Sequence, residues 1–319
     1  MGGIVDFEVA YPRSRRGVAE MSASSTVDVA DLMAITHTSA IPALGDDEQS
    51  WRLAVDAAEA LLARTGVTPA EITQVIFAGS GEWDLPFWSP AAKAAAALGV
   101  GRAHCFEVTN FCNAGMTAIQ VALDKISARG AGLVLVLIGD RLTRMVDYGD
   151  PASKELFNFG DAAAAVLVSG ADARFEVLHS AMRTDPEWVD YYYGEHSRGG
   201  VTIRRAAHRP GLASVYVENF SRLIDETLHA VSAKVDDVAW FLINHGDRRM
   251  HERLLDTVGI PRSRSTFNYD HLGHMSGADT LIALGDLRDR GELRRGDLVL
   301  LATSAMGFSW GITALECAA

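Results

Sequence analysis

Apolar residues follow two spacings that alternate along the chain. In segments such as 52–65 and 216–232, apolar side chains recur three or four residues apart, which predicts amphipathic helices. Short and nearly continuous apolar runs, such as 75–80 and 133–138, predict buried strands. Helices that alternate with buried strands are typical of an α/β protein, in which helices cover the faces of a sheet.

The same order of elements appears twice. The first series leads to Cys112 and continues beyond it: helix 52–65, strand 75–80, helix 90–98, strand 105–109, helix 114–128 and strand 133–138. The second series leads to His274 in the same way: helix 216–232, strand 240–245, helix 248–257, strand 265–269, helix 276–289 and strand 298–302. The closing segments, 159–168 and 308–316, are also alike. We therefore predict two matching halves, 1–169 and 170–319, although helix–strand units recur in any α/β protein.

Cys112 and His274 occupy equivalent places in these two series. Each follows the end of an expected strand and precedes a helix, which is where α/β sheets place their sites. A cysteine at the N-terminus of a helix can act as a nucleophile, because the helix dipole stabilises a thiolate. The alternative for Cys112 is a small apolar residue of the core. Two halves packed against each other would bring Cys112 and His274 together.

The composition excludes several classes of partner and cofactor. The 319 residues carry a formal net charge of −12, which argues against nucleic acid or anionic membranes as partners. Residues 1–25 lack the apolar core of a signal peptide, and no apolar run is long enough to cross a bilayer. Three irregularly spaced cysteines predict neither a disulfide framework nor a zinc site. We expect a cytoplasmic protein with no metal and no bound cofactor.

Five segments, taken together, resemble the β-ketoacyl-acyl-carrier-protein synthase III family of the thiolase superfamily. They are, in order, FCNAGMTAIQVA around Cys112, FGDAAAAVLV, WFLINH, HLGHMSGADTLIAL and GDLVLLATSAMGFSWG. The resemblance extends over nearly the whole chain, from IVDFEVAYP at 4–12 to 308–316. It implies a five-layer αβαβα thiolase-like fold, a homodimer, and Cys112 as the nucleophile that takes an acyl group from a thioester. It also implies an oxyanion hole formed by the backbone N–H groups of Cys112, Met306 and Gly307.

The chain departs from this family at several substrate contacts. The family's His-Gln-Ala-Asn reads His245-Gly246-Asp247-Arg248 here, and its Gly-Asn reads Gly273-His274. Met33 and His37 stand where the family has the tryptophan and arginine that hold coenzyme A, which favours a carrier protein as the donor. Gly115 replaces a phenylalanine three residues after the nucleophile, so Gly115 and Met306 are expected beside the substrate.

Asp279 follows His274 by five residues. This spacing resembles a branch of KAS III-like acyltransferases of antibiotic biosynthesis, in which cysteine, histidine and aspartate transfer an acyl group without forming a C–C bond. A carboxylate that holds one imidazole nitrogen fixes the tautomer and strengthens the other nitrogen as a base. The alternatives are a structural histidine at 274 and a helix N-terminal carboxylate at 279. His245 is either a second catalytic hydrogen-bond donor near the thioester or a relic.

Two further groups of side chains are candidate contacts. Phe87 and Trp88 belong to an aromatic segment that, in the family, approaches the acyl pocket of the partner subunit, and core packing is the alternative. Arg248, Arg249 and Arg253 lie on an expected helix, where they could dock an acidic acyl-carrier protein or simply be exposed charges.

The sequence thus predicts an acyltransferase of specialised metabolism. It would move an acyl group from a carrier-protein or coenzyme A thioester, through Cys112, to a hydroxyl or amine of a small-molecule acceptor. A second possibility is a decarboxylative β-ketoacyl synthase that uses His245 and His274. A third possibility, from a different class, is a non-catalytic partner subunit of another thiolase-fold protein, against which the presence of Cys112 and two histidines argues.

Overall fold

The computed structural model describes residues 2–129, 132–197, 200–207 and 209–318. The strands, in chain order, are β1 Gly3–Ala10, β2 Arg15–Gly17, β3 Ala40–Pro42, β4 Ile72–Gly79, β5 His104–Thr109, β6 Leu133–Gly139, β7 Ala163–Ser169, β8 Phe175–Thr184, β9 Tyr192–Ser197, β10 Gly200–Arg205, β11 Val238–Ile243, β12 Leu298–Ala305 and β13 Ser309–Cys317. The α-helices are α1 Val18–Ala23, α2 Val29–Thr36, α3 Ser50–Thr65, α4 Pro90–Ala97, α5 Ala114–Arg129, α6 Leu212–Ala230, α7 Arg248–Val258 and α8 Asp279–Asp289.

The main sheet consists of two half-sheets that share one short contact. Its strand order is β11-β12-β13-β8-β1-β7-β6-β4-β5. The central pair, β1 and β8, is joined only by Gly3 opposite Glu176 and Ile4 opposite Phe175. All other neighbouring strands of this sheet pair along most of their length. The two half-sheets therefore diverge from that contact and leave room for helices between them.

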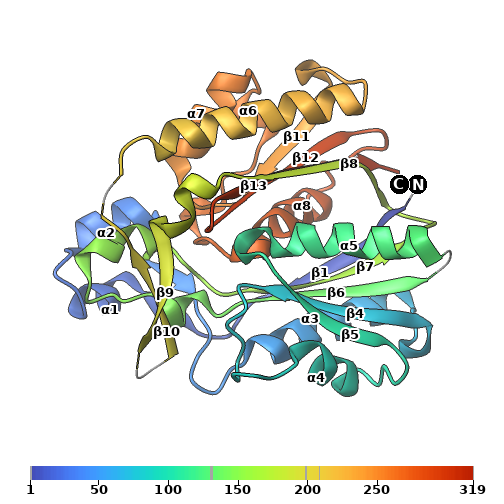
Figure 1. Ribbon diagram of the computed structural model, residues 1–319, viewed down its shortest axis with the longest axis horizontal. Helices are drawn as coiled ribbons and strands as arrows, with labels where there is room; N and C mark the ends of the chain where they lie inside the picture. The colour runs from blue at the N-terminus through green and yellow to red at the C-terminus, as the bar shows by residue number, and fades with distance from the viewer. Residues whose placement is uncertain (1, 130–131, 198–199, 208, 319) are drawn as a thin grey trace.

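Five layers result from this arrangement (Figure 1). Helices α5 and α8 lie between the half-sheets, where both contribute to one buried cluster. Helices α3 and α4 cover the outer face of the first half-sheet, and α6 and α7 cover the outer face of the second. Small residues on α5, such as Ala118 and Ala122, are fully buried and let the central helices fit between two sheets. The expected five-layer thiolase-like fold is confirmed.

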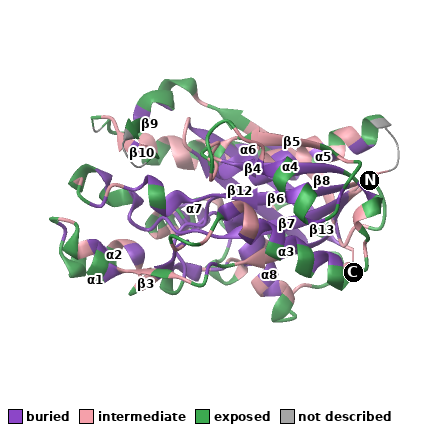
Figure 2. Cartoon of the chain, turned by 90° about the horizontal axis from the view of Figure 1, so that it is seen from below, coloured by how far each residue is buried: buried purple, intermediate pink, exposed green. Residues whose placement is uncertain are grey.

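The two halves repeat the same topology. The order β1-β7-β6-β4-β5 in the first half matches β8-β13-β12-β11 in the second half, which lacks a counterpart of β5. The expected boundary between residues 169 and 170 falls directly after β7 and before β8. Burial follows the same plan, because the strands of both half-sheets are largely buried and the outer helices expose one face (Figure 2).

The strand expected at 265–269 is wrong. Its first residues, 265–267, follow a 3-10 turn at Arg262–Arg264, its last two belong to a second one at Asn268–Asp270, and none of them pairs with a strand of the described ranges. Side chains take the carbonyl groups that a further strand would have used at the edge of β11. Arg264 Nη1 donates to the carbonyl of Val238 at 2.9 Å, and Ser265 Oγ donates to that of Phe241 at 2.5 Å. These two carbonyl groups of β11 therefore have hydrogen-bond donors although no further strand pairs with that edge.

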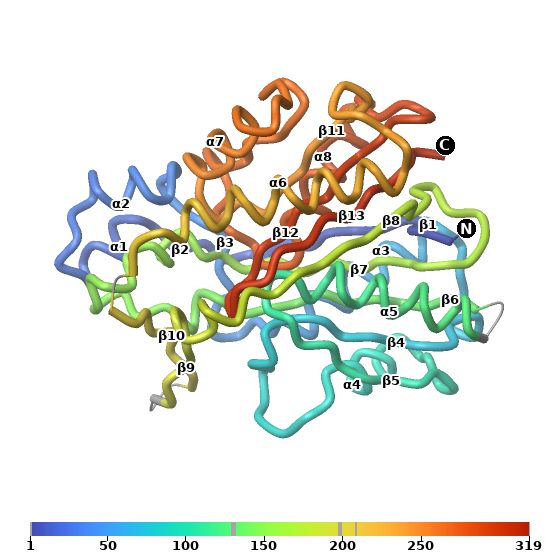
Figure 3. Tube along the Cα trace, turned by 45° about the horizontal axis from the view of Figure 1, so that its top comes forward, coloured from blue at the N-terminus to red at the C-terminus, as the bar shows by residue number. Residues whose placement is uncertain are grey.

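A set of small elements lies beyond one end of the sheet (Figure 3). Helices α1 and α2, the short pair β2–β3 and the hairpin β9–β10 gather there, while both chain termini lie at the opposite end. A separate buried cluster, which includes Leu32, Phe157 and Ile203, holds these elements together. These small elements were not predicted, because their sequences lack the long amphipathic pattern of segments such as 52–65 and 216–232. None of the helices in the described ranges is long and apolar enough to cross a membrane.

Candidate active site

Cys112 lies on a sharp turn between β5 and α5. The chain leaves β5 at Thr109, passes through a 3-10 turn at Phe111–Asn113 and enters α5. Phe111 has a φ of 47°, a left-handed conformation that a bulky residue rarely adopts. The amide of Asn110 supports the turn by donating to Thr117 Oγ1 at 2.8 Å. The strained residue thus directly precedes Cys112, whose side chain is buried and lines a cavity.

His274 is held by a segment of the other half of the chain. Its backbone N–H donates to the carbonyl of Asn158 at 2.7 Å, and its carbonyl accepts from Gly160 N at 3.0 Å. The ring of Phe159 packs edge-on against the imidazole, with 5.2 Å between the ring centroids. Gly273 permits this close pairing, because a Cβ there would lie 1.9 Å from the Asn158 carbonyl oxygen. Contacts on both sides of the residue therefore fix the direction of the His274 side chain.

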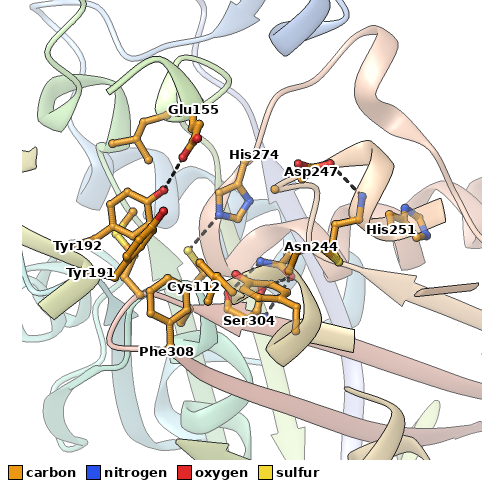
Figure 4. A pocket seen from close by; sticks show the side chains of 18 of the residues that line it. Cys112, Glu155, Tyr191, Tyr192, Asn244, Asp247, His251, His274, Ser304 and Phe308 are labelled. Carbon is orange, nitrogen blue, oxygen red and sulfur yellow. Dashed lines mark hydrogen bonds between the residues drawn. The ribbon is translucent and has the colours of Figure 1, made fainter. Parts of the chain in front are cut away.

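Cys112, His274 and Asp279 form one hydrogen-bonded chain. Cys112 Sγ lies 3.1 Å from His274 Nε2 (Figure 4), and His274 Nδ1 lies 2.5 Å from Asp279 Oδ2. Burial alone would lower the pKa of His274, but the Cys112 sulfur and the Asp279 carboxylate outweigh it and raise that pKa well above its usual value. The imidazole is therefore set to carry a proton between a sulfur on one side and a carboxylate on the other.

Asp279 accepts hydrogen bonds from several directions. Its Oδ1 accepts from Met275 N at 2.9 Å, and its Oδ2 accepts from the backbone N–H of His245 at 2.8 Å. Burial opposes its charge, but His274 and His245 hold the pKa of Asp279 well below the usual range of a carboxyl. Asp279 is therefore a carboxylate at neutral pH and can fix the tautomer of His274.

His245 lies behind Asp279 and outside the cavity. Its Nδ1 is 3.7 Å from Asp279 Oδ1, and its ring packs edge-on against Tyr269, with 4.8 Å between the ring centroids. Its side chain is almost completely buried, and His245 is not among the residues that line the cavity. The structure thus gives His245 a place beside Asp279 rather than the expected place near the thioester.

A cavity of about 500 Å³ opens in front of Cys112 and His274. Much of its wall is aromatic: Phe159, Tyr191, Tyr192, Tyr216 and Phe308. Its polar side chains include Glu155, Asn244, Asp247, His251 and Ser304 (Figure 4), and Arg209 also lines it. Burial raises the pKa of Tyr216 to about 12, so its hydroxyl is neutral. The cavity is large enough for a small acyl group and an acceptor beside the sulfur.

His251, on the cavity wall, has a defined tautomer. Ser265 Oγ donates its proton to the carbonyl of Phe241, so His251 Nε2, 2.8 Å from Ser265 Oγ, must donate to that oxygen. Burial and the nearby His245 lower the pKa of His251 to about 3. The ring also stacks on Phe267 with a centroid distance of 4.3 Å. His251 therefore forms a neutral part of the wall rather than a second acid–base group.

The turn between β12 and β13 borders the nucleophile. Met306 lines the cavity, and Gly307 has a φ of 80°. A Cβ added to Gly307 would lie 3.7 Å from the ring of Phe111, the residue before Cys112. The turn that carries Met306 and Gly307 thus lies beside Phe111, the residue that precedes Cys112, and the oxyanion hole at these N–H groups stays a prediction.

Three residues expected to contact substrate lie elsewhere in the single chain. Phe87 is fully exposed and Trp88 packs against Trp51, so neither lines the cavity. Contact of this segment with an acyl pocket would require a partner subunit. Gly115 also lies outside the cavity lining, and a Cβ there would meet Ile138 at 2.7 Å and the Gly277 carbonyl at 3.0 Å. Gly115 serves the close packing of α5 against the His274 loop.

The candidate docking arginines lie along α7. Arg249 and Arg253 are exposed, whereas Arg248 is half-buried and its guanidinium binds Glu252. Asp247, Met250 and His251, at the start of the same helix, line the cavity. The arginines therefore flank the cavity on its α7 side.

Several residues of the site were not predicted from the sequence. Asn244 and Ser304 lie within the recognised motifs WFLINH and GDLVLLATSAMGFSWG, but their side chains had no assigned role. The run Tyr191–Tyr192–Tyr193 was a visible signal, since two of its three rings line the cavity. In the described residues, no group of three or more histidine, cysteine, aspartate or glutamate side chains is arranged to hold a metal ion.

Comparison with known proteins gives matches over more than half of the chain. The family model of 3-oxoacyl-[acyl-carrier-protein] synthase III matches residues 106–186, and the model of its C-terminal part matches residues 228–317. The chain is 30% identical to the β-ketoacyl-[acyl-carrier-protein] synthase III of Rhodospirillum centenum, over 83% of each protein.

Two solved structures share the fold. The 3-oxoacyl-[acyl-carrier-protein] synthase III of Aquifex aeolicus is 23% identical, covers 99% of this chain and all of its own, and has a TM-score of 0.88. The acyltransferase ChlB3 is 20% identical, covers 99% of this chain and 98% of its own, and has a TM-score of 0.83.

Proposed function

The chain belongs to the 3-oxoacyl-[acyl-carrier-protein] synthase III family, and within that family we propose that it is an acyltransferase of specialised metabolism. Cys112 takes the acyl group from a thioester, and His274, held by Asp279, passes it to a hydroxyl or amine. The observation that carries this proposal is the hydrogen-bonded chain of Cys112, His274 and Asp279, with distances of 3.1 and 2.5 Å.

In the first step, the Cys112 thiolate attacks the carbonyl carbon of the donor thioester. A C–S bond forms and the carbonyl π electrons move to oxygen, which gives a tetrahedral oxyanion. The oxyanion collapses, the bond to the donor sulfur breaks, and the departing thiolate takes the proton from His274 Nε2. Backbone N–H groups of Cys112, Met306 and Gly307 stabilise the oxyanion, and their proximity in the structure supports this assignment.

In the second step, His274 acts as the base. The acceptor hydroxyl or amine loses a proton to His274 Nε2 as its oxygen or nitrogen attacks the acyl carbon. A second oxyanion collapses and releases Cys112 as a thiolate, which restores the ion pair with His274. Asp279 stabilises the imidazolium that forms in this step, because the carboxylate contacts Nδ1.

Charge and topology support a set of partners for this reaction. Arg248, Arg249 and Arg253 would dock an acidic acyl-carrier protein beside the cavity, and coenzyme A is the alternative donor. A small molecule is the acceptor. We also propose a homodimer, in which the exposed Phe87 and the adjacent Trp88 reach the acyl pocket of the partner subunit.

A decarboxylative β-ketoacyl synthase is the second candidate. It is favoured by the name of the Rhodospirillum centenum relative and by the presence of His245. Condensation needs two donors at the enolate oxygen, and the side chain of His245 contacts Asp279 instead of the cavity. One protein of this fold, ChlB3, is named an acyltransferase, which supports acyl transfer as a reaction of the fold.

The decisive experiment offers two acceptors to the same acyl-enzyme. Protein loaded with an acyl thioester is checked by intact mass and then mixed either with malonyl carrier or with a panel of small alcohols and amines. Acyl esters or amides without CO₂ release are expected. Release of CO₂ together with a β-ketoacyl product would overturn the proposal. If no acyl thioester ever labels Cys112, with Cys112→Ala as the blank, the chain is a non-catalytic partner subunit.

A further inference from the structure

The turn that carries Met306 and Gly307 is fastened at both of its stems. Ala305 and Ser309 pair across the turn, so Ala305 ends one stem, directly after Ser304, and Ser309 begins the other. Neither serine is held by the β12–β13 pairing alone, since a buried asparagine contacts each of them. These two contacts add to the strand pairing of the stems, in which Ser309 also pairs with Thr184 of β8.

The side chain of Asn244 binds both the backbone N–H and the backbone carbonyl of Ser304 in the first stem. Its Oδ1 accepts from Ser304 N at 3.1 Å, and its Nδ2 donates to the Ser304 carbonyl at 3.0 Å. Asn244 follows β11 directly, and its own backbone N–H donates to the carbonyl of Ala302 at 3.1 Å. The side chain therefore continues the β11–β12 ladder by one further pair of hydrogen bonds. Both residues are buried, which strengthens these bonds.

Asn113 holds the second stem from the residue next to the nucleophile. Its Nδ2 donates to Ser309 Oγ at 2.7 Å, and Asn113 is fully buried. Its Oδ1 has no hydrogen-bond partner within the described ranges, so the amide's contact with Ser309 comes at the cost of an unpaired acceptor. This bond links the Cys112 turn to the Met306–Gly307 turn without an intervening element.

We propose that Asn113 and Asn244 are positioning residues that hold the backbone N–H groups of Met306 and Gly307 at a fixed distance from Cys112 Sγ. This inference rests on the proposed function, because it assigns the two asparagines to the oxyanion of the acylation step. Neither side chain needs to touch the reacting atoms. They act by keeping the turn from moving relative to the sulfur, since small displacements of oxyanion donors reduce their effect.

Two reactions of the same sulfur test this proposal. Acylation by a thioester passes through an oxyanion, whereas alkylation by iodoacetamide displaces iodide at a CH₂ carbon and develops no oxyanion. Asn244→Leu keeps the size of the side chain and removes its hydrogen bonds. We expect acylation of the variant to slow about 10- to 100-fold, while alkylation stays within about two-fold of the wild-type rate. Both rates are measured by mass spectrometry of the peptide that contains Cys112.

Asn113→Leu is the second variant and should show the same split. Asn219→Leu is the matched control, because Asn219 donates from its side chain to the backbone of α6, at Val215, and plays no part in the turn; it should change neither rate. Equal losses in the acylation and alkylation rates would mean that the substitution disturbs the whole site. Wild-type rates for both reactions would mean that the two asparagines do not position the turn. Either result overturns the inference. Wild-type protein that never acylates would overturn the proposed function as well, so the two failures are distinguishable.

Discussion

His245 and His274 both contact the carboxylate of Asp279. The backbone N–H of His245 donates to Asp279 Oδ2 at 2.8 Å, and its Nδ1 lies 3.7 Å from Oδ1, while His274 Nδ1 contacts the same carboxylate at 2.5 Å. Only one of the two histidines therefore reaches Cys112.

This relationship predicts unequal effects of two substitutions. His245→Gln retains the backbone hydrogen bond to Asp279, so acyl transfer should fall less than about 10-fold. His274→Gln removes the base beside the sulfur, and transfer should fall by about 10³-fold or more. Both rates are measured with one acyl thioester and one acceptor. A loss for His245→Gln as large as that for His274→Gln would show that His245 acts in the chemistry.

Asp279→Asn should separate acceptors by their need for a base. The amide cannot stabilise the imidazolium and favours the wrong tautomer of His274, so transfer to an alcohol should fall about 10³- to 10⁴-fold. Hydroxylamine attacks without general-base help, and its discharge of the preformed acyl-enzyme should fall much less. The measurement is the loss of the acyl mass from Cys112 with each nucleophile. Equal losses would argue that Asp279 serves only the fold.

His274 should make stability depend on pH. Burial alone would lower the pKa of His274, but Cys112 and Asp279 raise it by more. The pKa of His274 in the folded protein therefore lies above the unfolded value of 6.5. A raised folded pKa contributes stability that is fully present below the unfolded pKa and is lost as pH rises through the folded value. The difference in unfolding free energy between wild type and His274→Gln should therefore shrink as the pH rises above the unfolded pKa of 6.5 and through the raised folded value.

Urea denaturation at several pH values provides this measurement. His229→Gln is the control, because His229 is an exposed histidine on α6. The same pH slope for both variants would contradict the assignment of the effect to His274.

Gly273→Ala should disturb the histidine without touching it. A Cβ at Gly273 would lie 1.9 Å from the carbonyl oxygen of Asn158, a backbone atom that cannot rotate away. We expect a loss of about 1–3 kcal/mol in unfolding free energy and a strong loss of transfer activity. Gly101→Ala is the control, because a Cβ there meets no atom within 4 Å. Wild-type activity of Gly273→Ala would mean that the Asn158 pairing does not hold His274.

The docking arginines predict a split between two kinds of donor. Charge reversal by Arg249→Glu together with Arg253→Glu should raise the KM for an acyl-carrier-protein donor about 10-fold or more, because both side chains are exposed on α7. The KM for a small acyl thioester should stay unchanged. Charge reversal at the exposed Arg290, on the loop after α8, is the control. An equal change with both donors would show that α7 is not the docking surface.

Much of the fold could be predicted from local patterns. The helices at 52–65, 90–98 and 114–128 appear within a few residues of their expected bounds as α3, α4 and α5. The absence of a strand at 265–269 could not be predicted, because the apolar and polar residues of this segment alternate as in a strand. The side chains of Arg264 and Ser265 decide the outcome by binding the carbonyl groups of β11.

The site could be predicted in its members more readily than in their arrangement. Cys112 and His274 are marked by strand-to-helix junctions, and Asp279 by its spacing from His274. No pattern in the sequence indicates which way Phe87 and Gly115 face. Gly115 faces the packed loop at Gly277, and Phe87 faces solvent in the single chain. Asn113 and Asn244 are likewise ordinary in the sequence, and their role depends on contacts 196 and 60 residues away along the chain.

The sequence by itself determined the family and the duplicated α/β plan, and it predicted Cys112 as the nucleophile. These properties depend on periodicity and on short motifs, which act over a few residues. The tertiary structure alone decided that the ring of His245 stays away from the sulfur. His245 ends the expected strand 240–245, and nothing in its local sequence indicates that its ring faces Asp279. The two histidines differ in direction because the Asn158–Gly160 segment binds the backbone of His274, whose ring faces Cys112. The ring of His245 is instead enclosed by Tyr269 and Asp279.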